Sequence, residues 1–191
     1  AAYGGVDFFA VKGVVEALAL ELGIGRLDFE ACRDNPSYHP GRCAVISVGG
    51  ACLGVMGQIH PLVMENYNTN AEIYTVELDV PALLVHKGGL TQYKPLAKFP
   101  AVSRDLALVC EEAVTAAQLE ACIREGIGGL LESIELFDVY RGTQLGEGRK
   151  SVAYTITMRD RTRTLTDADA DAAVCRALAL LEKNTGAVLR A

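Results

Sequence analysis

The chain has 191 residues, of which 50% are hydrophobic and 22% are charged, and its formal net charge is −6. This apolar content excludes a protein without a buried core, and the length allows one or two domains. The most apolar stretch, residues 14–22, contains Glu16 and Glu21 and falls short of the roughly 18 residues that a membrane-spanning helix requires, so we expect no membrane partner.

The cysteines and histidines lack the spacing of a metal site. No C-x-x-C pair occurs, and the three histidines are more than 20 residues apart. We therefore expect buried, reduced thiols and a cytoplasmic location. The first residues lack a signal sequence and an initiator Met, which predicts a fragment of a longer chain. The cysteines are Cys32, Cys43, Cys52, Cys110, Cys122 and Cys175.

Residues 8–22 have the periodicity of an amphipathic helix. Asp7 can accept hydrogen bonds from the N–H groups of the first turn, and Gly23 can adopt the left-handed conformation that ends a helix. The residues expected on the buried face recur at spacings of three and four: Phe8, Val11, Val15, Leu18 and Leu22.

Short apolar or alternating segments, separated by turn-forming residues such as glycine and proline, follow this helix. Gly49 and Gly50 separate two of them, which predicts a β-hairpin. Residues 87–100 contain two glycines and two prolines, and neither helical nor strand periodicity continues through them. We therefore place a domain boundary here, between residues 1–92 and residues 93–191. In the first domain we expect strands at 27–32, 43–48, 52–59 and 73–78 and short helices at 61–67 and 81–85.

The second domain has the order strand, helix, strand, strand, helix, strand. This is the order of the ferredoxin-like βαββαβ unit, an α+β fold in which two helices cover one face of a four-stranded antiparallel sheet. We expect these elements at 102–110, 115–125, 131–140, 151–158, 166–184 and 188–190.

The two faces of the third strand of this domain differ in chemistry. One set is large and apolar, and the other is small and mostly hydroxyl-bearing, so we assign the second set to the open side of the sheet. RNA-recognition modules bind single-stranded bases on such a face, although the fold alone serves many functions. The first set is Val152, Tyr154, Ile156 and Met158, and the second is Ser151, Ala153, Thr155 and Thr157.

Positive charge is concentrated in residues 141–163. Residues 1–92 contain five basic and ten acidic side chains, whereas residues 93–191 contain thirteen and fourteen. Because phosphate binding needs local positive potential, we expect Arg149 and Lys150 to meet an RNA backbone, although a solvated hairpin with a charged tip would carry the same run. The basic residues of the run are Arg141, Arg149, Lys150, Arg159, Arg161 and Arg163, against Glu147 and Asp160.

Five short blocks in the second domain carry a resemblance: FPAVSRDLA (99–107), FDVYRG (137–142), GRKSVA (148–153), RTLTD (163–167) and GAVLR (186–190). Together they resemble the anticodon-binding domain at the carboxy-terminal end of bacterial phenylalanyl-tRNA synthetase β subunits. Upstream, DFFAVKG (7–13), HPGRCA (39–44) and GVMGQIHP (54–61) are similar to the last part of the central module of that subunit. The resemblance covers nearly the whole chain.

The resemblance implies that residues 1–92 end a class II synthetase-like α/β module that has lost its chemistry. The implied partners are tRNA(Phe) and a catalytic α subunit in an α2β2 phenylalanine-tRNA ligase. That complete enzyme uses ATP and Mg²⁺, with no cofactor in this chain. We find no Gly-rich phosphate loop and no carboxylate cluster spaced for Mg²⁺. In the run of residues 39–42, Pro-Gly predicts a turn and Arg42 is expected to pair with a nearby carboxylate.

The resemblance also implies anticodon contacts by Tyr140, Ser151 and Arg190, with Asp138 a weaker candidate. Tyrosine offers a stacking surface, serine a hydroxyl, and arginine a planar donor fork. Strict alternation would place Asp138 and Tyr140 on the same side as Leu136, so a bulge or the end of the strand must intervene.

Two other functions stay open. A regulatory or small-molecule-binding module without RNA predicts a dry apolar pocket between the domains and binding that is independent of salt. An assembly module predicts a large exposed apolar patch. The hydroxyl-lined strand and the basic run favour RNA binding over both.

Overall fold

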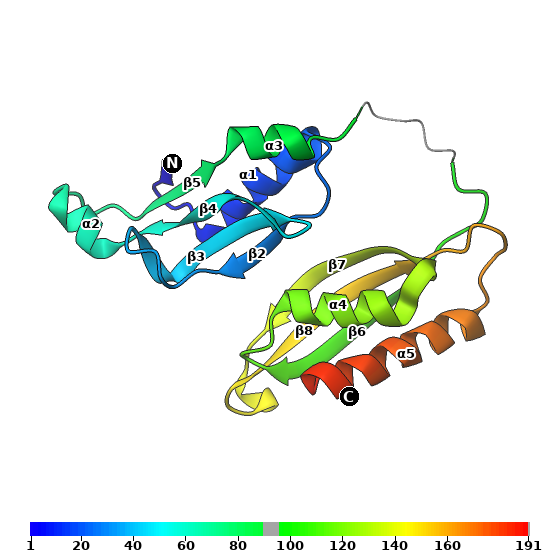
Figure 1. Cartoon of the computed structure of the whole chain (residues 1–191). Helices are drawn as coiled ribbons and strands as arrows, with labels where there is room; N and C mark the ends of the chain where they lie inside the picture. Colours follow the sequence, from blue (N-terminus) through cyan, green and yellow to red (C-terminus); the bar gives the residue numbers. More distant parts are fainter. Residues whose placement is uncertain (90–95, 191) are drawn as a thin grey trace. The chain divides into compact units, whose positions relative to one another are not determined.

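The computed structural model describes residues 1–89 and 96–190 (Figure 1). The chain divides into two compact units, Ala1–Tyr93 and Lys94–Ala191, each with its own sheet. The boundary predicted between residues 92 and 93 falls among residues 90–95, outside the described residues. In the described part of the chain, no helix is long and apolar enough to cross a membrane.

The first unit contains a five-stranded antiparallel sheet with the order β1-β5-β4-β3-β2. Gly49 and Gly50 join β3 to β4 with positive φ, as the predicted hairpin requires. The prediction missed β1 and began β3 too late, because the turn formers Pro40 and Gly41 lie inside that strand, where its register is irregular. The strands are β1 (Ala2–Tyr3), β2 (Asp28–Ala31), β3 (Tyr38–Val48), β4 (Ala51–Ile59) and β5 (Ile73–Leu78).

Helices α1 (Phe8–Glu21) and α3 (Val80–His86) pack on the same core cluster of this sheet, and α2 (Pro61–Asn66) follows β4. The Asp7 carboxylate accepts a hydrogen bond from the N–H of Ala10 at 2.8 Å, so the predicted helix cap is confirmed. The buried residues of α1 follow a spacing of four: Val11, Val15 and Ala19. The prediction that Leu18 is buried is wrong, because this residue is 42% exposed.

The second unit contains a four-stranded antiparallel sheet with the order β7-β8-β6-β9, and both long helices lie on the same face of it (Figure 1). The predicted ferredoxin-like α+β arrangement is therefore confirmed. The elements are β6 (Val102–Glu111), α4 (Ala116–Ile127), β7 (Leu131–Tyr140), β8 (Arg149–Met158), α5 (Asp167–Thr185) and β9 (Val188–Leu189), with 3-10 turns at Gly128–Leu130 and Thr143–Leu145.

The core of the second unit lies between the sheet and its two helices. The four apolar residues predicted for the helix-covered face of β8 are all buried there. Thr115 and Thr166 each form a capping box, which fixes the starts of α4 and α5. The helices touch at Gly126, where a Cβ atom would collide with the backbone of Ala177.

The cysteines differ from the expectation of buried thiols. Cys52 and Cys175 are exposed, and Cys32 is only partly buried, so the expectation is wrong for these three. All six cysteines are free, and the buried ones are Cys43, Cys110 and Cys122.

Candidate nucleic-acid interface

A β-bulge in β7 turns Asp138 and Tyr140 onto the open face of the sheet. Leu136 pairs with Tyr154, which faces the helices, and the next pair is Asp138 with Ala153 on the other side. One residue of β7 is therefore left without a partner, and the extra residue reverses the alternation of the strand. This is the irregularity that the sequence required at this point.

Tyr140, Ser151 and Arg190, the three residues that the resemblance implied, converge on this face. Tyr140 pairs directly with Ser151. Arg190 directly follows β9 at the other edge of the sheet, and its N–H donates to the carbonyl oxygen of Ala107 at 2.8 Å. The Arg190 guanidinium carbon lies 5.4 Å from the centroid of the Tyr140 ring. Because neighbouring strands are about 4.8 Å apart, three spacings separate the two residues by about 14 Å, so both side chains lean inward over the inner strands.

Ser151 is buried although it lies on the face of the sheet opposite α4 and α5. Its exposed fraction is 3%, and that of Val109, its partner on β6, is 8%. Val109 does not belong to the core cluster beneath the helices. Ser151 pairs with Tyr140 on β7, and the 3-10 turn at Thr143–Leu145 contacts β8. The expected accessible hydroxyl is thus covered in this conformation.

Gly142 sets the position of the Tyr140 ring. A Cβ atom at Gly142 would collide with the hydroxyl and ring carbons of Tyr140, so the ring packs directly against the glycine Cα. Any larger residue would displace the ring, because no other residue type leaves this space free. Sequence reasoning quoted this glycine within a motif and missed its role, since only the folded loop brings it onto the ring.

Asp138 and Arg190 lie at opposite edges of the next row of the open face. Ala153 and Ala107 lie between them, so methyl groups form the floor of this row. Asp138 is exposed, and its carboxylate makes no hydrogen bond or ion pair with the described residues. The row is a flat apolar surface bordered by one carboxylate and one guanidinium.

Two of the basic residues expected to provide positive potential converge on Glu112. The Arg141 guanidinium donates to the Glu112 carboxylate at 2.9 Å and 3.1 Å, and the Lys150 ammonium donates to the Glu112 carbonyl oxygen at 2.9 Å. The hydrogen bond from Arg141 lowers the pKa of the Glu112 carboxyl, which keeps the pair charged. Arg141 and Lys150 therefore stabilise the end of the sheet at Glu112.

Two further cations of the run also have internal partners. Arg159 donates to the Glu132 carboxylate at 2.8 Å and to the carbonyl oxygen of Phe99. Arg163 donates to both carboxylate oxygens of Asp169, at 2.7 Å and 2.9 Å. The net positive charge counted from the sequence therefore overstates the charge available to phosphates.

The guanidinium groups of Arg149 and Arg161 make no hydrogen bond or ion pair with residues 1–89 and 96–190. Arg149 continues the open-face series of Ser151, whereas Lys150 pairs with the buried Cys110 on the helix side. The two residues predicted to meet one RNA backbone thus lie on opposite faces of β8.

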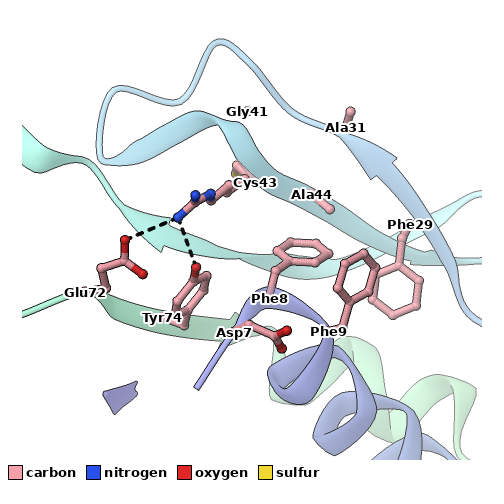
Figure 2. Close-up of a pocket in the computed structure, with 11 residues that line it drawn as sticks. Asp7, Phe8, Phe9, Phe29, Ala31, Gly41, Cys43, Ala44, Glu72 and Tyr74 are labelled. Atoms are coloured by element: carbon pink, nitrogen blue, oxygen red, sulfur yellow. Dashed lines mark hydrogen bonds and ion pairs between the residues drawn. The ribbon is translucent and has the colours of Figure 1, made fainter. Parts of the chain in front are cut away.

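A groove of about 590 Å³ lies in the first unit beside the N-terminus of α1 (Figure 2). Phe8, Phe9 and Phe29 line its apolar side. At its polar side one guanidinium nitrogen of Arg42 contacts Glu72 at 3.4 Å, as the sequence predicted. The same nitrogen also donates to the side-chain oxygens of Gln58 at 2.7 Å and Tyr74 at 3.4 Å.

The prediction of a turn at the Pro-Gly pair is wrong, because Pro40 and Gly41 lie inside β3, where its register is irregular. The Nδ1 atom of His39 accepts a hydrogen bond from the N–H of Gly41 at 3.0 Å. Among the described residues, no group of three or more His, Cys, Asp or Glu side chains is placed to hold a metal ion. His39 and Arg42 both make hydrogen bonds within this unit.

Comparison with known proteins agrees with both units. Residues 97–190 match the ferredoxin-fold anticodon binding domain, and residues 2–80 match the phenylalanyl tRNA synthetase beta chain CLM domain. The chain belongs to the phenylalanyl-tRNA synthetase beta-chain family. It is similar to phenylalanine–tRNA ligase beta subunits from Clostridium acetobutylicum (41% identical over 188 residues), Halalkalibacterium halodurans (45% over 186) and Bacillus subtilis (39% over 186). The alignments cover 98%, 97% and 97% of this chain but 24%, 23% and 23% of those relatives, so the chain spans about a quarter of their length.

Several residues in the motifs that identified this beta-chain family support the fold. Arg104 donates to Asp167 at 2.7 Å and to Asp171 at 3.2 Å, which joins β6 to the first turn of α5. The carboxylates also lie where the helix dipole favours negative charge. The family motifs therefore mix residues that hold the sheet and its helices together with residues on the open face.

Proposed function

We propose that the second unit of this beta-chain relative binds the anticodon of tRNA(Phe) on the open face of its sheet. The observation that carries the proposal is the bulge in β7, which puts Asp138 and Tyr140 on the same face as Ser151 and Arg190. Tyr140 would stack on a base, Arg190 would donate to a base edge or a phosphate, and Asp138 and Ser151 would bind polar base edges. Arg149 would meet the backbone.

The residues 1–92 and 93–191 act as separate functional domains in this proposal. The first is a scaffold within a cytoplasmic phenylalanine-tRNA ligase, and the second is the RNA-binding domain. The complete α2β2 enzyme charges tRNA(Phe) with phenylalanine, and its catalytic α subunit binds ATP and Mg²⁺. Lys150 makes no RNA contact in this proposal, because its ammonium already donates to the carbonyl oxygen of Glu112.

The test is a titration of the chain with two RNA stem-loops that share a stem and differ only in the anticodon, one of them that of tRNA(Phe). We expect at least about tenfold tighter binding of the tRNA(Phe) stem-loop, because each stacked or specifically bonded base contributes about 1 to 3 kcal/mol. Equal affinities for the two stem-loops would reject the proposal. The chain alone should also produce no phenylalanyl-adenylate from phenylalanine and ATP, and measurable adenylate would overturn its scaffold role.

A further inference from the structure

Cys32 and Cys43 face one another across the first unit's sheet. The last pair of the β2–β3 ladder is Ala31 with Ala44, and the next N–H, that of Cys32, donates to the carbonyl oxygen of Cys43 at 3.0 Å. The two cysteines are therefore opposite one another in an antiparallel pair. Cys32 is also close enough to raise the pKa of the Cys43 thiol, and both thiols are free.

This position brings the two backbones within the range that a disulfide spans. Opposed residues of a hydrogen-bonded antiparallel pair have Cα atoms about 5.5 Å apart, and disulfides join Cα atoms about 4.4 to 6.8 Å apart. The backbone can also adjust locally, because β2 ends at Ala31 and the register of β3 shifts between Tyr38 and Cys43.

We propose that Cys32 and Cys43 are a redox modification site, in which a peroxide converts the two thiols to a reversible disulfide. The bond would join the end of the edge strand β2 to β3 and close the loop of residues 33–42. This loop ends at Arg42, which lines the polar side of the groove and contacts Glu72. The site lies in the first unit and does not rest on anticodon binding by the second.

The chemistry proceeds in two steps that balance. Cys32 reacts first because it is the more exposed of the pair: its sulfur attacks the peroxide oxygen, the O–O bond breaks, and Cys32 sulfenic acid and water (or an alcohol) form. The Cys43 sulfur then attacks the sulfenic sulfur, the S–O bond breaks, and the departing hydroxide takes the Cys43 proton and leaves as water. The thiols lose two electrons in total, and the peroxide gains them.

The second step should depend on pH. Burial, followed by the nearby Cys32 thiol, raises the pKa of Cys43 to about 11, so its thiol is protonated near neutral pH. Ring closure should therefore be slow at neutral pH and accelerate as the pH rises, because the thiolate is the attacking form.

The other cysteines provide internal controls. Cys52 and Cys175 are exposed, and within residues 1–89 and 96–190 the only hydrogen bond of either sulfur is from Cys52 to the carbonyl oxygen of Gly54 at 3.9 Å, so peroxide should oxidise them without an internal disulfide. Cys110 and Cys122 lie in the core of the second unit and should remain reduced while the protein is folded.

The experiment treats the folded 191-residue chain with hydrogen peroxide at low protein concentration, blocks the remaining thiols by alkylation, and maps the peptides by mass spectrometry. We expect a peptide pair joined through Cys32 and Cys43, lighter than the two reduced peptides by about 2 Da and separated again by dithiothreitol. Cys32 and Cys43 that both remain alkylated after peroxide treatment would overturn the proposal.

Two variants then separate the steps. In Cys43→Ser, Cys32 should stop at the sulfenic acid, which dimedone traps, and the trapped amount should exceed that in the wild type several-fold. In Cys32→Ser, Cys43 should stay reduced. Equal dimedone labelling of Cys32 in the wild type and Cys43→Ser would contradict the proposal. If a variant fails to fold, the peptide map of the wild type alone still shows whether the disulfide between Cys32 and Cys43 forms.

Discussion

The guanidinium of Arg190 lies 5.4 Å from the centre of the Tyr140 ring, although the two residues belong to opposite edges of the second unit's sheet. A cation over an aromatic face is attracted by the ring quadrupole, and the contact is worth about 0.5 to 1 kcal/mol at an exposed site. Ser151, the partner of Tyr140 on β8, is 3% exposed. A base that stacks on the face of Tyr140 beside Arg190 would displace the guanidinium, which would then be available to the RNA.

Replacement of Tyr140 tests the stacking surface. Tyr140→Ala should weaken binding of the tRNA(Phe) anticodon stem-loop by about 1 to 3 kcal/mol, whereas Tyr140→Phe should lose only the hydroxyl contribution of about 1 kcal/mol. The melting temperature should change little, because the ring is 38% exposed and lies outside the core cluster. Unchanged affinity together with a large fall in melting temperature would show that the tyrosine is structural.

Replacement of Gly142 tests the same site without removing a contact group. Gly142→Ala should displace the Tyr140 ring, so we expect a severalfold loss of stem-loop affinity. Gly129→Ala is the matched control, because a Cβ atom at Gly129 would meet no atom within 4 Å. Affinities are measured by titration and folding by circular dichroism. Equal affinities of the two variants would mean that the ring position does not matter for RNA binding.

The salt dependence of binding distinguishes Arg149 from Lys150. Arg149→Gln should reduce the slope of log affinity against log salt by about 0.7 to 0.9, the value for one phosphate contact. Lys150→Gln should leave the slope unchanged, because its ammonium is held by the Glu112 carbonyl oxygen on the helix side. A smaller slope for Lys150→Gln alone would place the RNA backbone on the other side of β8.

Asp169 should make the second unit sensitive to acid. Hydrogen bonds from Arg163, and then from Thr166, hold the pKa of the Asp169 carboxyl well below its ordinary value. Its stabilising contribution is therefore complete above the ordinary carboxyl pKa of about 3.9 and is lost as the pH falls toward the folded pKa, because the unfolded chain binds the proton first.

The measurement compares melting temperatures of the wild type and Asp169→Asn between about pH 6 and about pH 3. The variant should melt lower at the higher pH, and the difference should narrow as the pH falls. In both proteins the backbone N–H of residue 169 can still donate to the Thr166 hydroxyl that caps α5. A difference that stays constant over this range would reject the assigned role of the carboxylate.

Local periodicity was sufficient to predict most elements of this chain. Alternation along β8 identified which residues face the helices, because successive side chains of a strand point to opposite sides whatever surrounds them. The capping residue Asp7 identified the start of α1, since the free N–H groups of a first turn need an acceptor close in sequence. For Asp138 and Tyr140, alternation required either a bulge or the end of the strand, and the structure has the bulge.

The tertiary structure decided what the side chains do in contact with distant parts of the chain. Lys150 and Arg149 are neighbours of equal charge, yet only the pairing of β8 with β6 shows that one is held by Glu112 and the other is not. The burial of Ser151 and the opposition of Cys32 and Cys43 likewise depend on strand register. A register joins residues that are separated by turns and loops, and its energy is a sum over many pairs, so no short segment of the sequence contains it.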